Sequence, residues 1–414
     1  MRKYWSLLFL IPFQVVNLFG QNPMPDTTAL SYTHFDPDFQ LAALPIIGSN
    51  PSTGFLFGAA GTAAWYMGPK QTTHLSSAQI SGLITSKQQK IFSIKSNVFL
   101  KDDKWDLIGD WRLFFSSAPT YGLGTGPQSK KPVANQSYEY AEGLFSEPIP
   151  TSQMMLFNYL RVHEIAMRKI RKSIYAGIGL HLDYHYQIKD NLLSLDTSNG
   201  ASPRITSHYA YSTLNGFTAN NYFLSGLSLN GLFDSRDNAI NPYSGRYALI
   251  SFRMNSNLMG SSKNSSLLWL EYRDYIHLNA ARPRHLIAFW TYGNFVTSGK
   301  VPYMDLPAVG WDQFGRSGRA YTQGRFRGNN LVYGEIEYRF PLQREKDLLG
   351  GVVFVNATTA SNTGYIKLFD YLDPAAGVGL RLMLKKDARV NVTADYGIGK
   401  YGAHGFFFNV NETF

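Results

Sequence analysis

Apolar and polar residues alternate along much of this chain with a period of two. Over the fifteen residues 174–188, the even positions carry Ile, Ala, Leu or Tyr, and the odd positions carry mostly Gly, His, Asp and Gln. Such alternation is typical of a β-strand with one apolar and one polar face. An ordinary soluble strand has ~5–6 residues, whereas a tilted strand that crosses a membrane needs ~9–11. The length therefore favours a membrane-spanning strand.

The same alternation recurs often enough to predict a large barrel. It predicts sixteen strands, an even number, as in bacterial outer-membrane barrels. Their residues are 42–49, 54–66, 73–85, 89–100, 104–117, 152–167, 173–189, 221–233, 246–257, 265–280, 284–298, 330–342, 348–357, 375–385, 388–399 and 403–414.

The four longest gaps between these strands all fall at one end of the predicted barrel. They are 118–151, 190–220, 299–329 and 358–374, and each follows an odd-numbered strand. Outer-membrane barrels have long extracellular loops and short periplasmic turns. We therefore expect this end to face outward and both ends of the mature chain to be periplasmic.

Composition supports the same class. Hydrophobic residues make up 44% and aromatic residues 15%, but charged residues only 16%, against about 25% in soluble domains. The interpretation is an all-β, sixteen-stranded antiparallel transmembrane β-barrel, multi-pass in the cell outer membrane of a Gram-negative bacterium. A large soluble β-sandwich is the rival fold. There is no cysteine, so disulfides and thiolate metal sites are excluded.

The N-terminus has the layout of an export signal. Arg2 and Lys3 precede a mostly apolar stretch that ends at Phe19, which predicts a signal peptide over residues 1–20. Residues 21–41 then form a short periplasmic segment, and 42–414 form the barrel. Removing Arg2 and Lys3 from the 39 basic residues leaves 37 against 29 acidic ones, a net charge of +8. No recognition helix accompanies this charge, so no nucleic-acid partner is expected.

A turn motif lies between the eighth and ninth predicted strands. It has the form D-x-R-D-N-x-x-x-P-x-x-G and consists of Asp234, Arg236, Asp237, Asn238, Pro242 and Gly245. Asp and Asn tighten turns, Pro sets φ, and Gly accepts positive φ. The motif resembles one in the bacterial surface antigen family, the BamA/TamA-like superfamily of outer-membrane barrels. In the predicted topology it lies on the periplasmic side.

A second stretch, 318–330, resembles the long inward-folded loop of that family, which carries an Arg-Gly-aromatic motif. The matching residues are Arg319, Tyr321, Gly324, Arg325 and Arg327. The resemblance implies that Arg319 reaches into the lumen and pairs with Glu337, with Asn356 standing where the family often has an aspartate. Ala320 replaces the usual glycine. Solvated loop charges are the alternative interpretation of these arginines.

The C-terminus resembles the last-strand signal that the barrel-assembly machinery recognises. Phe406, Phe408, Val410 and Phe414 are expected on one face of the last strand. Family members with assembly roles carry periplasmic POTRA domains before the barrel. Only about twenty residues precede strand 1 here, so a barrel-only member is expected.

Function follows mainly from the resemblance, which implies insertion or translocation of outer-membrane proteins, or of lipid, at a seam between the first and last strands. The expected partners are the outer-membrane lipid bilayer, the barrel-assembly machinery, client proteins and a separate periplasmic partner. The alternatives are a passive solute channel and a barrel-embedded hydrolase. We found no catalytic motif and expect no cofactor and no metal, although His181, Asp183 and His185 share one face.

Overall fold

The computed structural model describes residues 39–50, 54–127, 139–198, 200–279, 281–343, 348–386 and 389–414. The chain divides into two units, Met1–Asp36 and Pro37–Phe414, and all described residues belong to the second. The predicted signal peptide, and the predicted periplasmic segment up to residue 38, lie outside the described residues.

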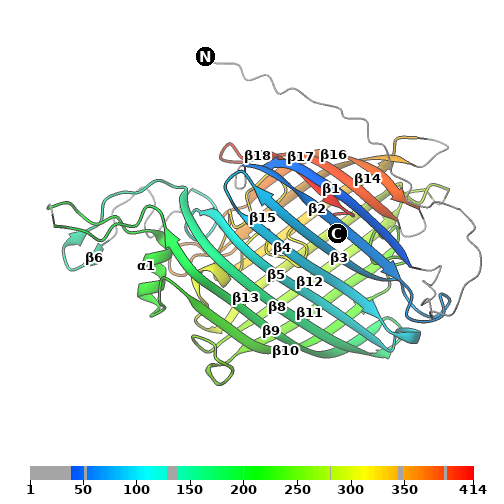
Figure 1. The fold of residues 1–414 in the computed structure, drawn as a ribbon, viewed down its shortest axis with the longest axis horizontal. Helices are drawn as coiled ribbons and strands as arrows, with labels where there is room; N and C mark the ends of the chain where they lie inside the picture. The colour runs from blue at the N-terminus through cyan, green and yellow to red at the C-terminus, as the bar shows by residue number, and fades with distance from the viewer. Residues whose placement is uncertain are drawn as a thin grey trace, which may run out of the picture. The chain divides into compact units, whose positions relative to one another are not determined.

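Sixteen strands form one antiparallel sheet whose order follows the chain (Figure 1). The Cα atoms of the last strand come within 8 Å of those of the first, so the sheet curls into a barrel. The strands are β1 (Gln40–Asn50), β2 (Gly54–Trp65), β3 (Ser76–Thr85), β4 (Lys90–Phe99), β5 (Trp105–Thr120), β8 (Gln153–Arg171), β9 (Ile174–Asp190), β10 (Tyr222–Asp234), β11 (Gly245–Asn255), β12 (Ser265–His277), β13 (Leu286–Gly299), β14 (Asn330–Pro341), β15 (Leu349–Ala360), β16 (Asp373–Lys385), β17 (Val390–Gly399) and β18 (His404–Val410).

The sixteen-stranded barrel agrees with the prediction, although several strand ends differ from the predicted bounds by two to four residues. The long loops contain elements that alternation did not reveal, namely the hairpin of β6 (Glu139–Ala141) and β7 (Leu144–Phe145), and the helix α1 (Ser207–Leu214). The predicted last strand, 403–414, is too long, because β18 ends at Val410. Among the described residues, no helix combines the length and the apolar character needed to cross a bilayer.

The alternation in β9 corresponds to two physically different faces. Ile178 is 64% exposed on the outside of the barrel, whereas Asp183 and His185 are buried in the lumen. Large apolar side chains such as Phe57 and Leu380 continue the outer surface on other strands. A band of this kind faces hydrocarbon, and the lumen keeps the polar partners.

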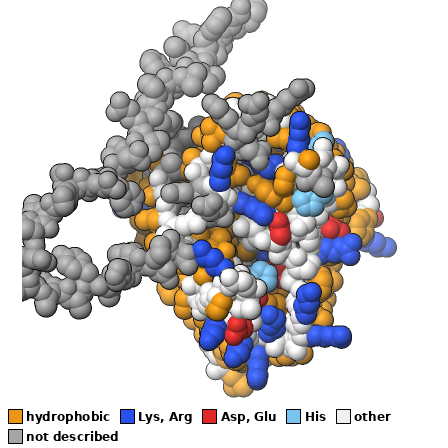
Figure 2. Space-filling view, turned by 90° about the vertical axis from the view of Figure 1, so that its right-hand side faces the viewer, with side chains coloured by type: hydrophobic (Ala, Val, Ile, Leu, Met, Phe, Trp, Pro, Cys, Tyr) orange, Lys and Arg blue, Asp and Glu red, His pale blue; other side chains and the backbone are white. Residues whose placement is uncertain are grey.

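The two ends of the barrel differ. The loops after β5, β9, β13 and β15 lie at what we call the long-loop end, where α1 is seen at the left of Figure 1. The opposite, short-turn end is shown in Figure 2, where Lys and Arg side chains are spread over the surface and Asp and Glu are few. Exposed cations there include Lys70, Lys101, Lys104, Arg171, Lys172 and Lys386.

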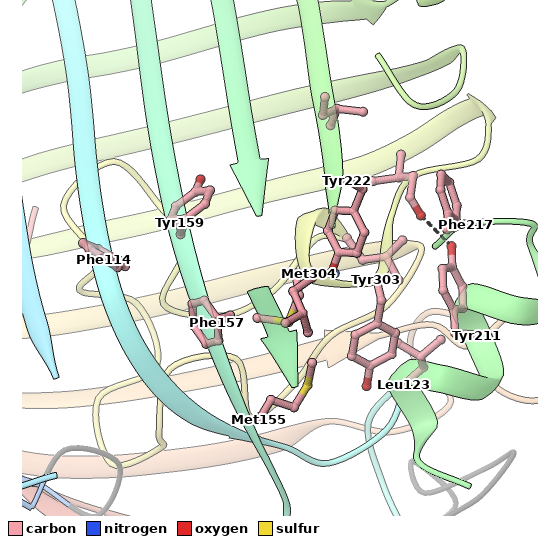
Figure 3. Packing of buried hydrophobic residues seen from close by; sticks show 14 of the residues in the cluster. Phe114, Leu123, Met155, Phe157, Tyr159, Tyr211, Phe217, Tyr222, Tyr303 and Met304 are labelled. Carbon is pink, nitrogen blue, oxygen red and sulfur yellow. Dashed lines mark hydrogen bonds between the residues drawn. The ribbon is translucent and has the colours of Figure 1, made fainter. Parts of the chain in front are cut away.

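A cluster of aromatic and aliphatic side chains fills the lumen toward the long-loop end (Figure 3). It joins the wall strands to α1 and to the loop that follows β13. The hydroxyl of Tyr303 lies 2.6 Å from that of Thr120, and the hydroxyl of Tyr211 donates to the carbonyl of Val301 at 2.8 Å. These contacts anchor the start of the loop beside the wall.

Candidate functional site

The loop between β13 and β14, residues 300–329, is folded into the barrel. It begins with the 3-10 turn η3 (Tyr303–Asp305) and buries Met304, Val309 and Phe326. Its tip is held by the carboxylate of Asp312, which accepts hydrogen bonds from the backbone N–H groups of Arg316 and Ser317. The loop therefore has a defined shape inside the lumen, as the resemblance implied.

Arg319 is the centre of the contacts between this loop and the wall. Its guanidinium donates to Asp395 on β17 at 2.7 Å, to Glu335 on β14 at 2.5 Å, and to Glu337 on β14. It also lies 3.7 Å from the ring centroid of Phe354 on β15. Arg319 is only 2% exposed, and a planar fork can serve several carboxylates at once in a way that a lysine cannot.

Further cations balance the carboxylates around Arg319. Arg381 donates to Asp395 at 2.5 Å and to Glu412 at 2.7 Å, and Arg339 donates to Glu337 at 2.6 Å. Buried charges are tolerated only when they are paired and hydrogen-bonded. The cluster therefore joins β14, β16, β17, the loop and the chain end into one connected network.

Asn356, the uncharged residue at the aspartate position, lies in the same network. Its side-chain amide donates to the carbonyl of Arg319 at 3.2 Å and to Glu335 at 3.3 Å. Of the residues predicted here, Arg319, Glu337 and Asn356 thus lie together. Glu335 shares the polar face of β14 with Glu337, but Asp395 was missed, because only closure of the barrel brings β17 to the loop.

The backbone of Ala320 adopts a conformation that favours glycine, with φ of +95°. Its neighbour Gly397 on β17 provides the space, because a Cβ there would lie within about 3 Å of atoms of Ala320. The chain thus keeps the tight approach of the loop to β17 while carrying a side chain where the family usually has none. The strain at Ala320 costs free energy that the contacts of Arg319 offset.

The other loop residues of the motif fasten it at further points. The hydroxyl of Tyr321 donates to the carbonyl of Pro374 at 2.6 Å, and Gly324 has φ of +75°. Arg325 stacks on aromatic rings, 4.1 Å from the centroid of Tyr121. Arg327 donates to the backbone carbonyl of Met304 at 2.5 Å and so ties the end of the loop to its beginning.

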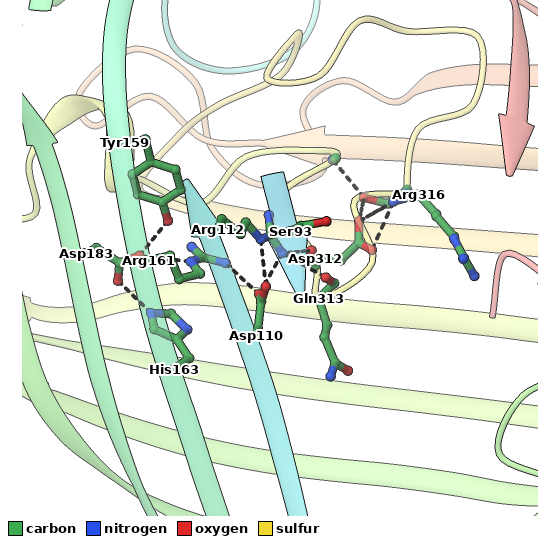
Figure 4. A network of polar contacts seen from close by, with 12 residues as sticks. Ser93, Asp110, Arg112, Tyr159, Arg161, His163, Asp183, Asp312, Gln313 and Arg316 are labelled. Carbon is green, nitrogen blue, oxygen red and sulfur yellow. Dashed lines mark hydrogen bonds and ion pairs between the residues drawn. The ribbon is translucent and has the colours of Figure 1, made fainter. Parts of the chain in front are cut away.

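On the opposite wall, Arg112 of β5 also holds the loop (Figure 4). Its guanidinium donates to the carbonyls of Asp312 and Gln313 at 2.7 and 2.9 Å, and pairs with Asp110 on its own strand at 2.7 Å. The network continues through Arg161 to Asp183 on β9. The loop is therefore held between two walls of the barrel.

His181, Asp183 and His185 lie on the lumenal face, where other side chains of the barrel surround them. Asp183 is surrounded by Arg161, His163 and Arg253. His181 Nε2 lies 2.7 Å from Oγ of Ser228, but its Nδ1 has no hydrogen-bond partner in the structure. The orienting carboxylate of a hydrolytic triad is missing there. The described residues contain no group of three or more acidic or His side chains placed to hold a metal ion.

The D-x-R-D-N motif forms the turn between β10 and β11 at the short-turn end. Arg236 pairs with Asp234 at 2.7 Å, and the Asn238 side chain accepts hydrogen bonds from two backbone N–H groups farther along the turn. Pro242 is buried. Gly245 has φ of +97°, and a Cβ there would lie 2.2 Å from a backbone carbonyl oxygen.

This turn also reaches a distant part of the barrel. Asp237 accepts a hydrogen bond at 2.7 Å from Arg389, which lies in the turn between β16 and β17. The guanidinium of Arg389 lies 4.0 Å from the ring centroid of Tyr243. The motif thus joins two turns of the short-turn end whose paired residues are 152 positions apart in sequence.

The chain end corrects one prediction. Phe406 and Phe408 are 55% and 44% exposed on the outer face, but Val410 and Phe414 are only 4% exposed and lie inside the barrel. Asn411 has φ of +72°, and Arg316 of the loop donates to the backbone carbonyl of Val410 at 2.6 Å. The last residues therefore turn into the lumen instead of continuing the strand, so the four do not share one face.

A cavity of about 320 Å³ lies in the lumen and reaches the junction of β1 and β18. Its lining includes Ile46 of β1, Phe406 and Phe408 of β18, and the loop residues Trp311 and Arg316. In the described residues, β1 and β18 lie beside each other without a paired register, whereas every other pair of neighbouring strands in the sheet has one. We call this junction the seam.

Comparison with solved structures shows the same fold elsewhere. BamA from Haemophilus ducreyi lacking POTRA domains 1–3 superposes with a TM-score of 0.55 and 13% identity, over 91% of this chain and 70% of that one. CdiB from Acinetobacter baumannii superposes with a TM-score of 0.51 and 13% identity, over 90% of this chain and 59% of that one. No curated protein is a significant match in sequence.

A family model fits the chain more directly. The Omp85 superfamily domain matches residues 169–414. That range contains the turn motif, the inward loop with Arg319, and the closing strands whose side chains bind it. The chain is therefore an outer-membrane β-barrel that belongs to the Omp85 superfamily.

Proposed function

We propose that this barrel inserts or translocates outer-membrane polypeptides at the seam between β1 and β18. One observation carries the proposal: the seam strands lie side by side without a paired register, while the lumenal route is occupied by the loop. Unpaired strand edges present rows of N–H and C=O groups that template an incoming strand. A client strand could therefore pair there without passing through the filled lumen.

The composition of the seam supports an edge that opens. Pro45 lies within β1, and proline has no backbone N–H to donate across the seam. On the other side, β18 is short and its end turns inward at Asn411. Both features limit the number of hydrogen bonds that would have to break for the seam to separate.

The passive-channel hypothesis has less support. The loop is fastened to opposite walls by Arg319 and Arg112, and the aromatic cluster lies across the lumen toward the long-loop end. A sixteen-stranded barrel without a plug would leave an aqueous channel. Here the loop of residues 300–329 and the aromatic cluster occupy that space, so we expect the intact barrel to conduct ions poorly.

A separate periplasmic partner is a further part of the proposal. The many exposed cations of the short-turn end, such as Lys101 and Lys172, would attract an acidic surface. Such a partner would deliver clients to the seam. Attachment would weaken as ionic strength rises, because surface charges are screened within about 8 Å at physiological salt.

The test is site-specific photo-crosslinking in cells. A benzophenone amino acid at Ile46 on β1 should trap nascent outer-membrane proteins. The matched control is the same amino acid at Leu229, which is 58% exposed on β10, away from the seam. Adducts with client proteins at Ile46 but not at Leu229 are expected. If only β18 or lipid is trapped at Ile46, the seam does not receive clients.

A further inference from the structure

The cavity at the seam has two chemically different linings. Around the seam its walls are apolar, with Ile46, Phe406 and Phe408, and the last two face outward on β18. Elsewhere the same cavity is lined by Lys95, Arg112 and Arg316. Its volume of about 320 Å³ falls in the range of small-molecule sites. A space with these two linings matches an amphiphile better than water or a peptide strand alone.

Lys95 is the feature that points to an anion. It lies on the lumenal face of β4, and no carboxylate of a described residue lies within 4.0 Å of its ammonium nitrogen. Its Nζ lies 5.5 Å from the ring centroid of Phe314 on the loop. Lys95 is half-buried in the cavity wall, and a bound anion would stabilise a cation that has no counter-ion among the described residues within 4.0 Å.

The neighbouring charges do not neutralise Lys95. Asp110 is already shared by Arg112 and Arg161, and the carboxylate of Asp312 is used by the backbone of the loop tip. The hydroxyls of Ser81 and Ser93, which lie 2.7 Å apart in the same lining, add neutral hydrogen-bonding groups. In the polar part of the cavity, the positive charge of Lys95 is therefore not neutralised by these carboxylates, and it lies in the same lining as hydroxyl groups.

We propose that the cavity holds one anionic phospholipid of the surrounding bilayer, with its phosphate near Lys95 and its acyl chains leaving through the seam past Phe406 and Phe408. The lipid would lie at the junction of β1 and β18 and compete with pairing between their edges. This inference uses the same seam as the proposed function, but it requires no client protein, so either can fail without the other.

Native mass spectrometry of the full chain, released from nanodiscs, tests the proposal. The probes are nanodiscs of phosphatidylcholine containing either phosphatidylglycerol or no anionic lipid. The wild type should retain one phosphatidylglycerol and no phosphatidylcholine. Lys95→Gln should weaken retention about tenfold or more, because a hydrogen bond to a charged group is lost. Lys104→Gln, at an exposed lysine of the short-turn end, should retain the lipid as the wild type does.

A second variant tests occupancy of the cavity without changing charge. Ser93→Trp should fill part of the space and exclude the lipid while Lys95 remains. Resistance of the folded barrel to SDS shows that each variant is folded. Equal retention by the wild type, Lys95→Gln and Ser93→Trp would overturn the proposal. Crosslinking of client proteins at Ile46 is measured separately in Ser93→Trp. If it persists although lipid is no longer retained, client binding does not depend on the lipid, and the two proposals are tested independently.

Discussion

Replacing Arg319 by alanine should destabilise the barrel more than any other single change in the loop. The guanidinium is 2% exposed and pairs with Glu335, Glu337 and Asp395, whose side chains are fully buried. Removing one partner of a buried ion pair costs about 3–5 kcal/mol, since a charge is left uncompensated. Arg339 and Arg381 remain and reduce the loss, so we expect about 3 kcal/mol.

The assay is urea unfolding of the barrel in lipid vesicles, followed by tryptophan fluorescence and extrapolated to water. Arg319→Lys should recover only part of the loss, because an ammonium cannot match the planar fork. Arg325→Ala is the matched control: Arg325 stacks on Tyr121 and Tyr401, and losing such contacts costs about 1–2 kcal/mol.

A double-mutant cycle isolates the interaction itself. Glu335→Gln in the wild type should be destabilising, but in the Arg319→Ala background it should be nearly neutral, because it removes one of the carboxylates left without a partner. If Arg319→Ala lies within 1 kcal/mol of the wild type, or if the two changes are simply additive, the network does not hold the loop and the reasoning is refuted.

Three further predictions concern backbone strain and pH. Ala320→Gly should stabilise the barrel by about 1 kcal/mol in the same urea assay, since it relieves a φ of +95°; a loss of stability would contradict this. Gly245→Ala should lower the free energy of unfolding by about 1–3 kcal/mol, because the residue has φ of +97° and the added Cβ would collide with a backbone carbonyl. The control is Gly334→Ala, which should not show this penalty, because no atom lies within 4 Å of the position of the added Cβ. The side-chain hydrogen bond to Asp103 raises the pKa of His74 above its usual 6.5, so the stability that this pair contributes is complete below about pH 6.5 and is lost as pH rises through the raised pKa. His74→Gln should therefore cost more at pH 5.5 than at pH 9, and an equal cost at both would exclude the linkage.

The stability that His74 and Asp103 contribute together also decreases at low pH. Burial favours the neutral form of Asp103, but the hydrogen bonds from the side chain and backbone of His74 outweigh it and lower the pKa of Asp103 below 3.8. The contribution of the carboxylate is therefore present above about pH 3.8 and is lost as pH falls through the lowered pKa. The destabilisation by His74→Gln should accordingly be largest between about pH 3.8 and about pH 6.5.

Much of the barrel could be predicted from the sequence, because the alternation of apolar and polar side chains is a property of each strand by itself. A strand that separates lipid from lumen must alternate, and β9 shows this as far as Tyr186. At Gln187, which has φ of +52°, the two faces exchange, so Ile188 is buried in the lumen although the sequence predicts it on the outer face. Strand number and the end carrying the long loops follow from the same pattern. Helix α1 could not be found in this way, since a short helix in a loop has no period-two signal; the side chain of Thr206 caps it by accepting a hydrogen bond.

The contacts across the lumen could be predicted only in part. Resemblance to a family motif pointed to Arg319 and Glu337, whereas Asp395 lies on a strand that only barrel closure brings to the loop. The inward turn at Asn411 was missed for a related reason. In the sequence, Phe406, Phe408, Val410 and Phe414 keep one parity, interrupted by Glu412. In the structure, Arg316 binds the backbone carbonyls of Val410 and Glu412, and the chain turns inward.

Ion conductance of single barrels in planar bilayers tests the central claim most directly, namely that the loop fills the lumen and leaves the seam as the working surface. We predict small conductance for the intact chain, brief openings for Arg319→Ala, and a large, steady conductance when residues 303–327 are replaced by a short Gly-Ser linker. A large, steady conductance in the intact barrel would contradict the account.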